Sequence, residues 1–126
     1  MKKAGLLLLC GAFAVALVAL TNSLEARPQY RKEHDAQYKG SAIEGALKEA
    51  KCNTCHYGKS KKNHNDYGKA LIKAGLTKDS FTKLKKDKPA LSKHVKEALE
   101  KVVQGEEGKK FADRIKDGKL PGTNPE

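Results

Sequence analysis

The sequence contains few of the residues that build a large apolar core. Its 126 residues include no tryptophan, three phenylalanines and four tyrosines, whereas 33% of them are charged. A chain of this size with so few large apolar side chains has a thin core. Such a chain is marginally stable unless a covalent link or a bound cofactor adds stability. Strand-like alternation of apolar and polar residues is almost missing, so the expected fold class is all-α.

Other absences restrict the chemistry. Methionine occurs once, as Met1, so none is available in the rest of the chain. The sequence offers no constellation of acidic and basic residues suited to acid–base catalysis, and we do not expect an enzyme. Aromatic stacking motifs are also missing, which argues against nucleic acid as a partner.

The N-terminal residues 1–26 have the three parts of a signal peptide. Two lysines give a positive start, residues 6–20 are apolar, and residues 24–26 (Leu-Glu-Ala) offer a cleavage site with a small residue at its end. The apolar run is short for a membrane span, which needs roughly 20 residues, although an uncleaved anchor stays open as an alternative. Cys10 lies inside this run and is discarded with it. We therefore expect export to the periplasm or an equivalent compartment outside the cytoplasm.

The rest of the chain divides into three parts. Residues 27–40 are polar and are expected to form an extended or irregular arm. Residues 41–120 follow helical spacing with breaks at glycine and proline, and they form the expected domain. Residues 121–126 are expected to be a disordered tail. The expected helices, about four to five and all short, cover 42–50, 66–74, a turn after 77, 89–102 and 106–117.

The most specific signal is the run Cys52-Asn53-Thr54-Cys55-His56, a C-x-x-C-H motif. Two thiols about one helical turn apart can each form a thioether with a former vinyl group of the same haem. The imidazole of His56 is then carried under the macrocycle, where its nitrogen binds iron from the proximal face. Together with the export signal, the motif predicts one haem c, covalently attached through Cys52 and Cys55.

Three other uses of the cysteine pair agree less well with the sequence. A structural zinc site needs four ligands, usually in two separated pairs, and the remaining histidines are not paired at such spacing. A thioredoxin-like redox pair expects a strand–helix–strand neighbourhood, which this chain lacks. A disulfide between residues three apart would close too small a loop to stabilise much, so no disulfide is expected.

The motif, the helix that leads into it and a closing helix with an inward aromatic together resemble class I cytochrome c over residues 41–120. The resemblance implies a cytochrome c-like helical bundle around one haem and a monohaem electron carrier. In that family the first and last helices cross closely, which implies that Gly45 meets Phe111. Residues 65–71, Asn-Asp-Tyr-Gly-Lys-Ala-Leu, are also similar to those of small planctomycete-type cytochromes. The family commonly uses methionine as its distal iron ligand, and its lack here puts a high reduction potential in doubt.

Several residues compete for the distal side of the iron. His94 is the preferred candidate, because it lies where the family supplies its distal ligand and at the edge of an apolar helix face. His64 closely follows the motif, where the family often has a hydrogen-bonded structural residue. His34 lies in the polar arm, a poor place to hold a ligand. A lysine ligand and an open position stay alternatives.

The distal ligand decides between two functions. Two axial imidazoles give a haem of low potential that suits electron transfer between redox partners. An open or weakly ligated site would bind small gases such as nitric oxide or carbon monoxide. Haem-based gas binding or sensing is therefore the alternative function.

The chain is strongly basic, with a formal net charge of +11. Without residues 1–26 it keeps 24 basic and 14 acidic residues, a formal charge of +10 before the haem carboxylates are counted. Such a surface is expected to steer the protein toward a redox partner with an acidic docking surface or toward an anionic membrane surface. Membership of a larger complex stays open. The two expected patches are Lys59, Lys61 and Lys62, and Lys83, Lys85, Lys86 and Lys88.

Overall fold

The structure, a computed structural model, describes residues 27–126, and the expected signal peptide lies outside this part. Of the described residues, 63% are helical and none belongs to a β-strand, which confirms the all-α expectation. Six α-helices form within residues 27–126, one more than expected, because the polar arm is helical as well. The elements are α1 (Pro28–Gln37), α2 (Glu44–Ala50), a 3₁₀ turn η1 (Lys51–Thr54), α3 (Asp66–Lys73), α4 (Lys78–Leu84), α5 (Lys88–Val102) and α6 (Gly105–Lys116).

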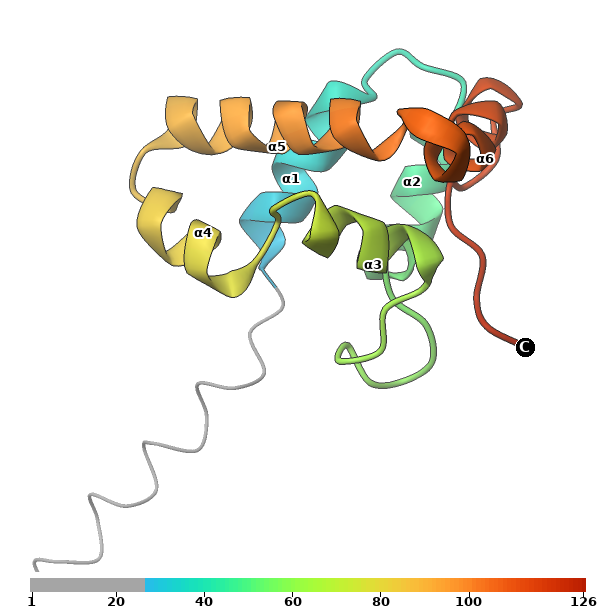
Figure 1. The fold of residues 1–126 in the computed structure, drawn as a ribbon, viewed down its shortest axis with the longest axis horizontal. Coiled ribbons are helices and arrows are strands. Elements are labelled where there is room, and N and C mark those ends of the chain that lie inside the picture. The colour runs from blue at the N-terminus through green and yellow to red at the C-terminus, as the bar shows by residue number, and fades with distance from the viewer. Residues whose placement is uncertain (1–26) are drawn as a thin grey trace, which may run out of the picture.

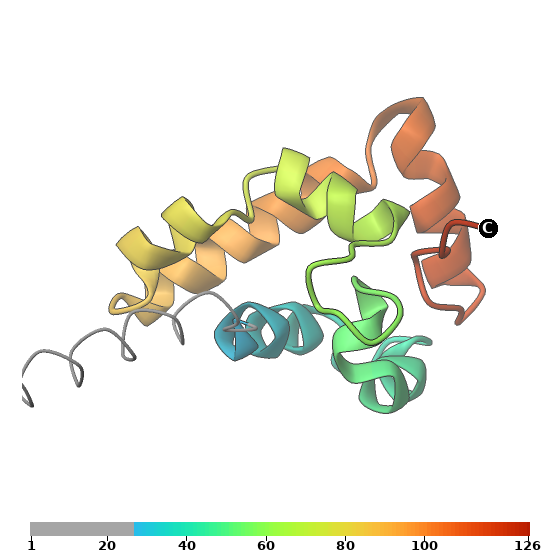
Figure 2. The same cartoon turned by 90° about the horizontal axis from the view of Figure 1, so that it is seen from below.

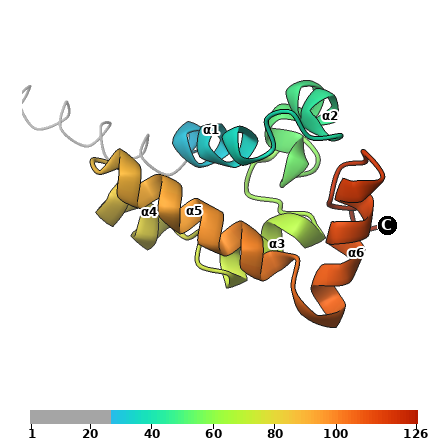
Figure 3. The ribbon, with the colours of Figure 1, turned by 90° about the horizontal axis from the view of Figure 1, so that it is seen from above.

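The longest helix, α5, is the centre of the arrangement. It contacts α1, α3, α4 and α6 (Figure 1). Helices α3, α4 and α5 lie on one side, α1 and α2 lie on the other, and the loop after η1 lies between α2 and α3 (Figure 2). Helix α6 crosses the end of α5, as the view from above shows (Figure 3). The motif residues therefore lie between the two groups of helices.

The sequence of α5 explains both its start and its buried face. Pro89 occupies the first turn, where the missing N–H would have no helical partner, and Asp87 Oδ1 accepts a hydrogen bond from Ala90 N at 3.1 Å. The buried face is the one expected from the apolar spacing, and most of it packs into a core with Tyr67 and Phe111. Its buried residues are Leu91, Val95, Ala98, Leu99 and Val102.

The expectation of an extended arm at residues 27–40 is wrong. Pro28 begins α1, and His34 is the only residue of this helix that is buried, with 4% of its surface exposed. The Tyr30 hydroxyl donates to the Thr77 carbonyl oxygen at 3.1 Å, and the Tyr30 ring packs edge-on against Phe81 at 5.2 Å. These partners lie more than 40 residues away, so the local polarity of the arm did not reveal the helix.

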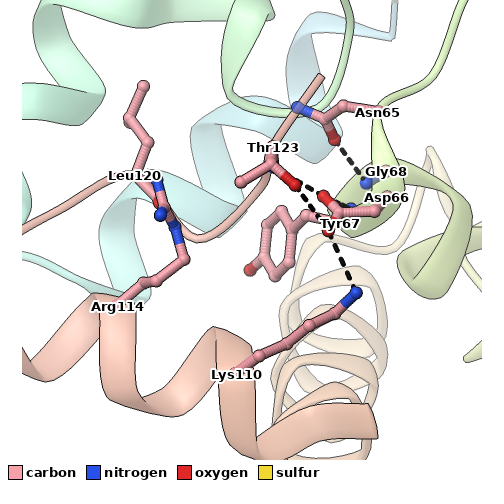
Figure 4. A network of polar contacts seen from close by, with 8 residues as sticks. All are labelled: Asn65, Asp66, Tyr67, Gly68, Lys110, Arg114, Leu120 and Thr123. Carbon is pink, nitrogen blue, oxygen red and sulfur yellow. Dashed lines mark hydrogen bonds and ion pairs between the residues drawn. The ribbon is translucent and has the colours of Figure 1, made fainter. Parts of the chain in front are cut away.

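The expectation of a disordered tail at residues 121–126 is also wrong for its first half. Pro121 is fully buried. Thr123 donates to both carboxylate oxygens of Asp66, from its N–H at 2.6 Å and from its hydroxyl at 3.0 Å. Lys110 of α6 adds an ion pair to the same carboxylate at 3.1 Å (Figure 4). Asp66 thus fastens the tail and α6 to the first turn of α3.

The Asp66 contacts predict an acid-sensitive part of the stability. Burial alone would raise the pKa of Asp66, but the hydrogen bonds from Thr123, Lys110 and the Tyr67 N–H outweigh it and lower the pKa from its usual 3.8. A lowered pKa stabilises the fold above the unfolded-state pKa, and that contribution is lost as pH falls through the folded-state value. We expect Asp66→Asn to cost on the order of 1 kcal/mol at pH 7, because the carboxylate is partly exposed.

The measurement is the melting temperature from pH 7 down to pH 2. The variant should lose less stability than the wild type over the acidic part of this range. Asp113→Asn, at an exposed position on α6, makes the same change in charge and should follow the wild-type curve. Parallel curves for the wild type and Asp66→Asn would contradict the assignment.

Candidate haem site

The two cysteines and the histidine of the motif line a single open-sided cavity of about 340 Å³. This volume lies within the range of small-molecule and cofactor sites, roughly 300–1,000 Å³. The walls come from α1, from the motif, from the loop that follows it and from α3. The lining residues are Arg27, Pro28, Tyr30, Arg31, His34, Asp35, Lys51, Cys52, Thr54, Cys55, His56, Lys61, Lys62, His64, Gly68, Leu71, Ile72 and Leu76.

The cysteines are held on a tight turn. The amide groups of Cys55 and His56 both donate to the Cys52 carbonyl oxygen, at 3.3 and 3.1 Å, and both thiols are free. Burial raises the pKa of Cys55 to about 12, and the negative charges of Asp35 and Cys52 add to the effect. The Cys55 position therefore favours an uncharged sulfur. A thioether sulfur is uncharged, whereas a zinc-bound thiolate is not.

His56 has a hydrogen bond of the kind that metal-binding histidines usually make. Its Nδ1 lies 3.1 Å from the Asn63 carbonyl oxygen. A carbonyl oxygen can only accept, so Nδ1 carries the proton and Nε2 keeps its lone pair. Burial and the neighbouring His64 lower the pKa of His56, which favours the neutral ring. Metal-binding histidines usually donate their second N–H to a backbone carbonyl in this way.

The start of α3 is bound directly to the motif. Asn65 donates from its side chain to the Thr54 carbonyl oxygen at 3.0 Å and from its backbone to the Cys55 carbonyl oxygen at 2.9 Å. Its Oδ1 accepts from Gly68 N at 2.9 Å, which caps α3. A Cβ on Gly68 would overlap the Cys55 carbonyl oxygen, so only glycine allows this approach. The sequence offered these residues only as part of a resemblance, without their roles.

Two observations test whether the cavity suits a haem. Thr54 Oγ1, in the cavity wall, is buried and has no hydrogen-bond partner, which is rare for a buried hydroxyl. Haem brings two carboxylates, and the lining contains five basic side chains against the single carboxylate of Asp35. The residues present therefore fit the group. The basic side chains are Arg27, Arg31, Lys51, Lys61 and Lys62.

His94 is not brought together with the motif. It is half-buried, as expected for the edge of the α5 face, but it does not line the cavity. Its Nε2 lies 3.0 Å from the Gly75 carbonyl oxygen and therefore carries a proton. At His94, the edge of α5 that points inward faces the turn after α3. Gly75 in this turn has no side chain and leaves room for the His94 imidazole ring. The structure thus gives no support to His94 as distal ligand.

Two other histidines do line the cavity. The His64 ring lies against that of His56, with 4.5 Å between the centroids, and the two residues form an isolated β-bridge. His34 reaches the cavity from α1, a different element. Sequence reasoning placed His34 on an irregular arm and therefore underrated it. The signal that could have found it is the spacing of Tyr30 and His34, four residues apart after Pro28, which places both on one side of a helix.

The helix crossing implied by the resemblance is not formed by Gly45 and Phe111. A Cβ on Gly45 would meet nothing within 4 Å, so no side chain packs closely on this glycine. Phe111 instead packs edge-on against Tyr67 at 5.3 Å. A close approach through a glycine does occur between α3 and the motif, at Gly68.

No protein-family model, curated protein or solved structure matches the chain. Within residues 27–126, no helix is both long and apolar enough to cross a bilayer. In the same part of the chain, no group of three or more His, Cys, Asp and Glu side chains could hold a metal ion.

The two glycines predict opposite effects of the same substitution. Gly68→Ala should destabilise the protein by roughly 1–3 kcal/mol, because the new methyl group forces α3 away from Cys55. Gly45→Ala should stabilise it by about 0.5–1 kcal/mol, because the methyl group meets open space inside a helix. Urea unfolding of both variants measures the difference. Equal effects of the two substitutions would contradict the packing described for the motif.

Proposed function

We propose that the chain is an exported monohaem c-type cytochrome that carries single electrons between redox partners. The carrying observation is that Cys52, Cys55 and His56 line one cofactor-sized cavity, with His56 Nε2 unprotonated and its Nδ1 fixed by Asn63. In this proposal Cys52 and Cys55 attach the haem and His56 is the proximal iron ligand. The helices then form a cytochrome c-like bundle around the haem, and no catalytic residues are proposed.

The chain's own groups have separate tasks in this function. Bound haem supplies a one-electron iron couple. The Asn63 carbonyl fixes the orientation of His56, and the buried side chains of Leu71 and Leu76 exclude water from the inner wall. The basic side chains that line the cavity would offset the charge of the haem carboxylates. The apolar wall of Leu71 and Leu76 on one side and the positively charged side chains on the other would hold the haem in one orientation.

A gas-binding function is the second candidate, and one observation favours it. His94 lies outside the cavity, and both ring nitrogens of His34 already have hydrogen-bond partners. A haem with no distal protein ligand has an open position that binds nitric oxide or carbon monoxide. The state of the distal side therefore separates the two functions.

Covalent attachment is the first test. The full chain is produced together with a cytochrome c maturation system and denatured, and its intact mass is measured after acid–acetone extraction. We expect the mass of the mature polypeptide plus one haem, with the colour retained by the protein. Replacing Cys52 and Cys55 together by serine should abolish this added mass. Cys10→Ser, within the expected signal peptide, is the matched control and should leave it unchanged; a bare polypeptide mass for the wild type would refute the proposal.

The positive surface predicts rates that depend on salt. Lys61 and Lys62 line the cavity rim, and Lys59 is exposed beside them. Oxidation of the reduced protein by anionic hexacyanoferrate should slow roughly tenfold or more as ionic strength rises, because screening removes the attraction. Oxidation by a cationic cobalt complex should accelerate. Substituting these three lysines by glutamate should reduce the first effect more than the same change at Lys83, Lys85 and Lys86; rates indifferent to salt would exclude steering.

A further inference from the structure

Helix α1 buries one side chain, and that side chain is an imidazole. The helix is polar along its length, yet His34 is only 4% exposed and lines the cavity that holds the C-x-x-C-H motif. The contacts of Tyr30 with Thr77 and Phe81 hold α1 against α4. His34 is therefore presented by an anchored helix, and the objection that a flexible arm cannot hold a ligand does not apply.

The hydrogen bonds of His34 leave the correct nitrogen unprotonated. Nδ1 lies 3.1 Å from Asp35 Oδ1, an oxygen that accepts when the carboxylate is ionised. With the proton on Nδ1, Nε2 is an acceptor, and the Tyr67 hydroxyl, at 3.0 Å, donates to it. A carboxylate on Nδ1 and an unprotonated Nε2 are the usual setting of a histidine that binds a metal, although here the Nε2 lone pair accepts the hydrogen bond from Tyr67.

The other histidines are less suitable. Iron between two imidazoles separates the ligating nitrogens by about 4 Å, since each bond is near 2 Å, and it separates the ring centroids by more. The rings of His56 and His64 are only 4.5 Å apart between centroids and are joined by a backbone bridge. His64 thus packs beside the proximal ring, whereas His94 is outside the cavity and has its Nε2 protonated.

We propose that His34 Nε2 is the second axial ligand of the haem iron, with Asp35 as the residue that orients the ring. The inference rests on the proposed haem attachment. Ligation exchanges the hydrogen bond from Tyr67 for a coordinate bond to iron and involves no change of oxidation state. Electron transfer then uses a bis-imidazole haem, with the second imidazole supplied by a helix that precedes the motif in the chain.

The test compares three full-length proteins that carry covalent haem: the wild type, His34→Ala and His94→Ala. Optical and electron paramagnetic resonance spectra of the ferric state report the spin state. The wild type and His94→Ala should be low-spin, and His34→Ala should be high-spin. Ferrous His34→Ala should bind carbon monoxide at least about tenfold faster than the wild type, because no bound imidazole has to leave. Added imidazole should restore the low-spin spectrum of His34→Ala.

Two further variants keep the inference testable if His34→Ala does not fold. His34→Met should retain a low-spin haem with a sulfur–iron absorption band and a higher reduction potential. Tyr67→Phe removes the hydrogen bond to Nε2 and should leave the wild-type spectrum unchanged.

Three outcomes would overturn the assignment while haem attachment stands. They are a low-spin spectrum of His34→Ala without added imidazole, a loss of the low-spin state in His94→Ala instead, and a high-spin wild type with the full haem-bearing mass. The intact mass distinguishes these outcomes from a failure of the proposed function, since that failure leaves no haem on the wild type. An unchanged nitrogen-ligand spectrum in His34→Met would equally exclude residue 34 as the ligand.

Discussion

The contact between the Cys55 carbonyl group and the first turn of α3 is the constraint on which the other features depend. Asn65 N donates to this carbonyl, and Gly68 packs against it so closely that a Cβ would overlap it. Asn65 also caps α3, and the next residue, Asp66, holds the C-terminal tail through Thr123. The motif, α3 and the C-terminal tail are thus held by three neighbouring residues, Asn65, Asp66 and Gly68. A shift of α3 would move the motif and release the tail together.

This constraint explains how a small core and a large cavity coexist. Leu71 and Leu76 belong to the core with Val95 and Phe111, and they also line the cavity beside the motif. The inner wall of the cavity is therefore the surface of the core. An apolar group bound there would extend the core and bury this surface. Because a thioether-linked group cannot dissociate, its contribution to stability would not depend on the concentration of free cofactor, as it does for a reversibly bound ligand.

The features that could be predicted from the sequence are those set by local spacing. The apolar residues of α5 recur at helical intervals, and Pro89 marks its start, so its bounds and buried face were predicted correctly. The adjacency of Cys52, Cys55 and His56 is local as well, and the structure places all three in one cavity. The polar wall around them was not predicted, because Arg27 and Arg31 come from α1, whose helical state depends on Tyr30 meeting Thr77 and Phe81.

Which further histidine shares the cavity with the motif could not be read from the sequence for the same reason. A helical wheel places His94 at the edge of a buried face, but it does not say which neighbour that edge faces, and here it is Gly75. The same wheel gives α1 little apolar face, and only the spacing of Tyr30 four residues before His34 points to a buried side. Burial of a polar residue depends on a partner, and for His34 that partner is the Tyr67 hydroxyl, 33 residues away.

The weak apolar attachment of α1 has a consequence for the site. A helix that buries a single side chain gains little from the hydrophobic effect, so its position depends on a few polar and aromatic contacts. Such a helix opens more readily than α5, which buries five residues. A bond from His34 to the iron would add a strong contact between α1 and the motif. The haem and the helix would then stabilise each other, which couples closure of the cavity to completion of the iron coordination.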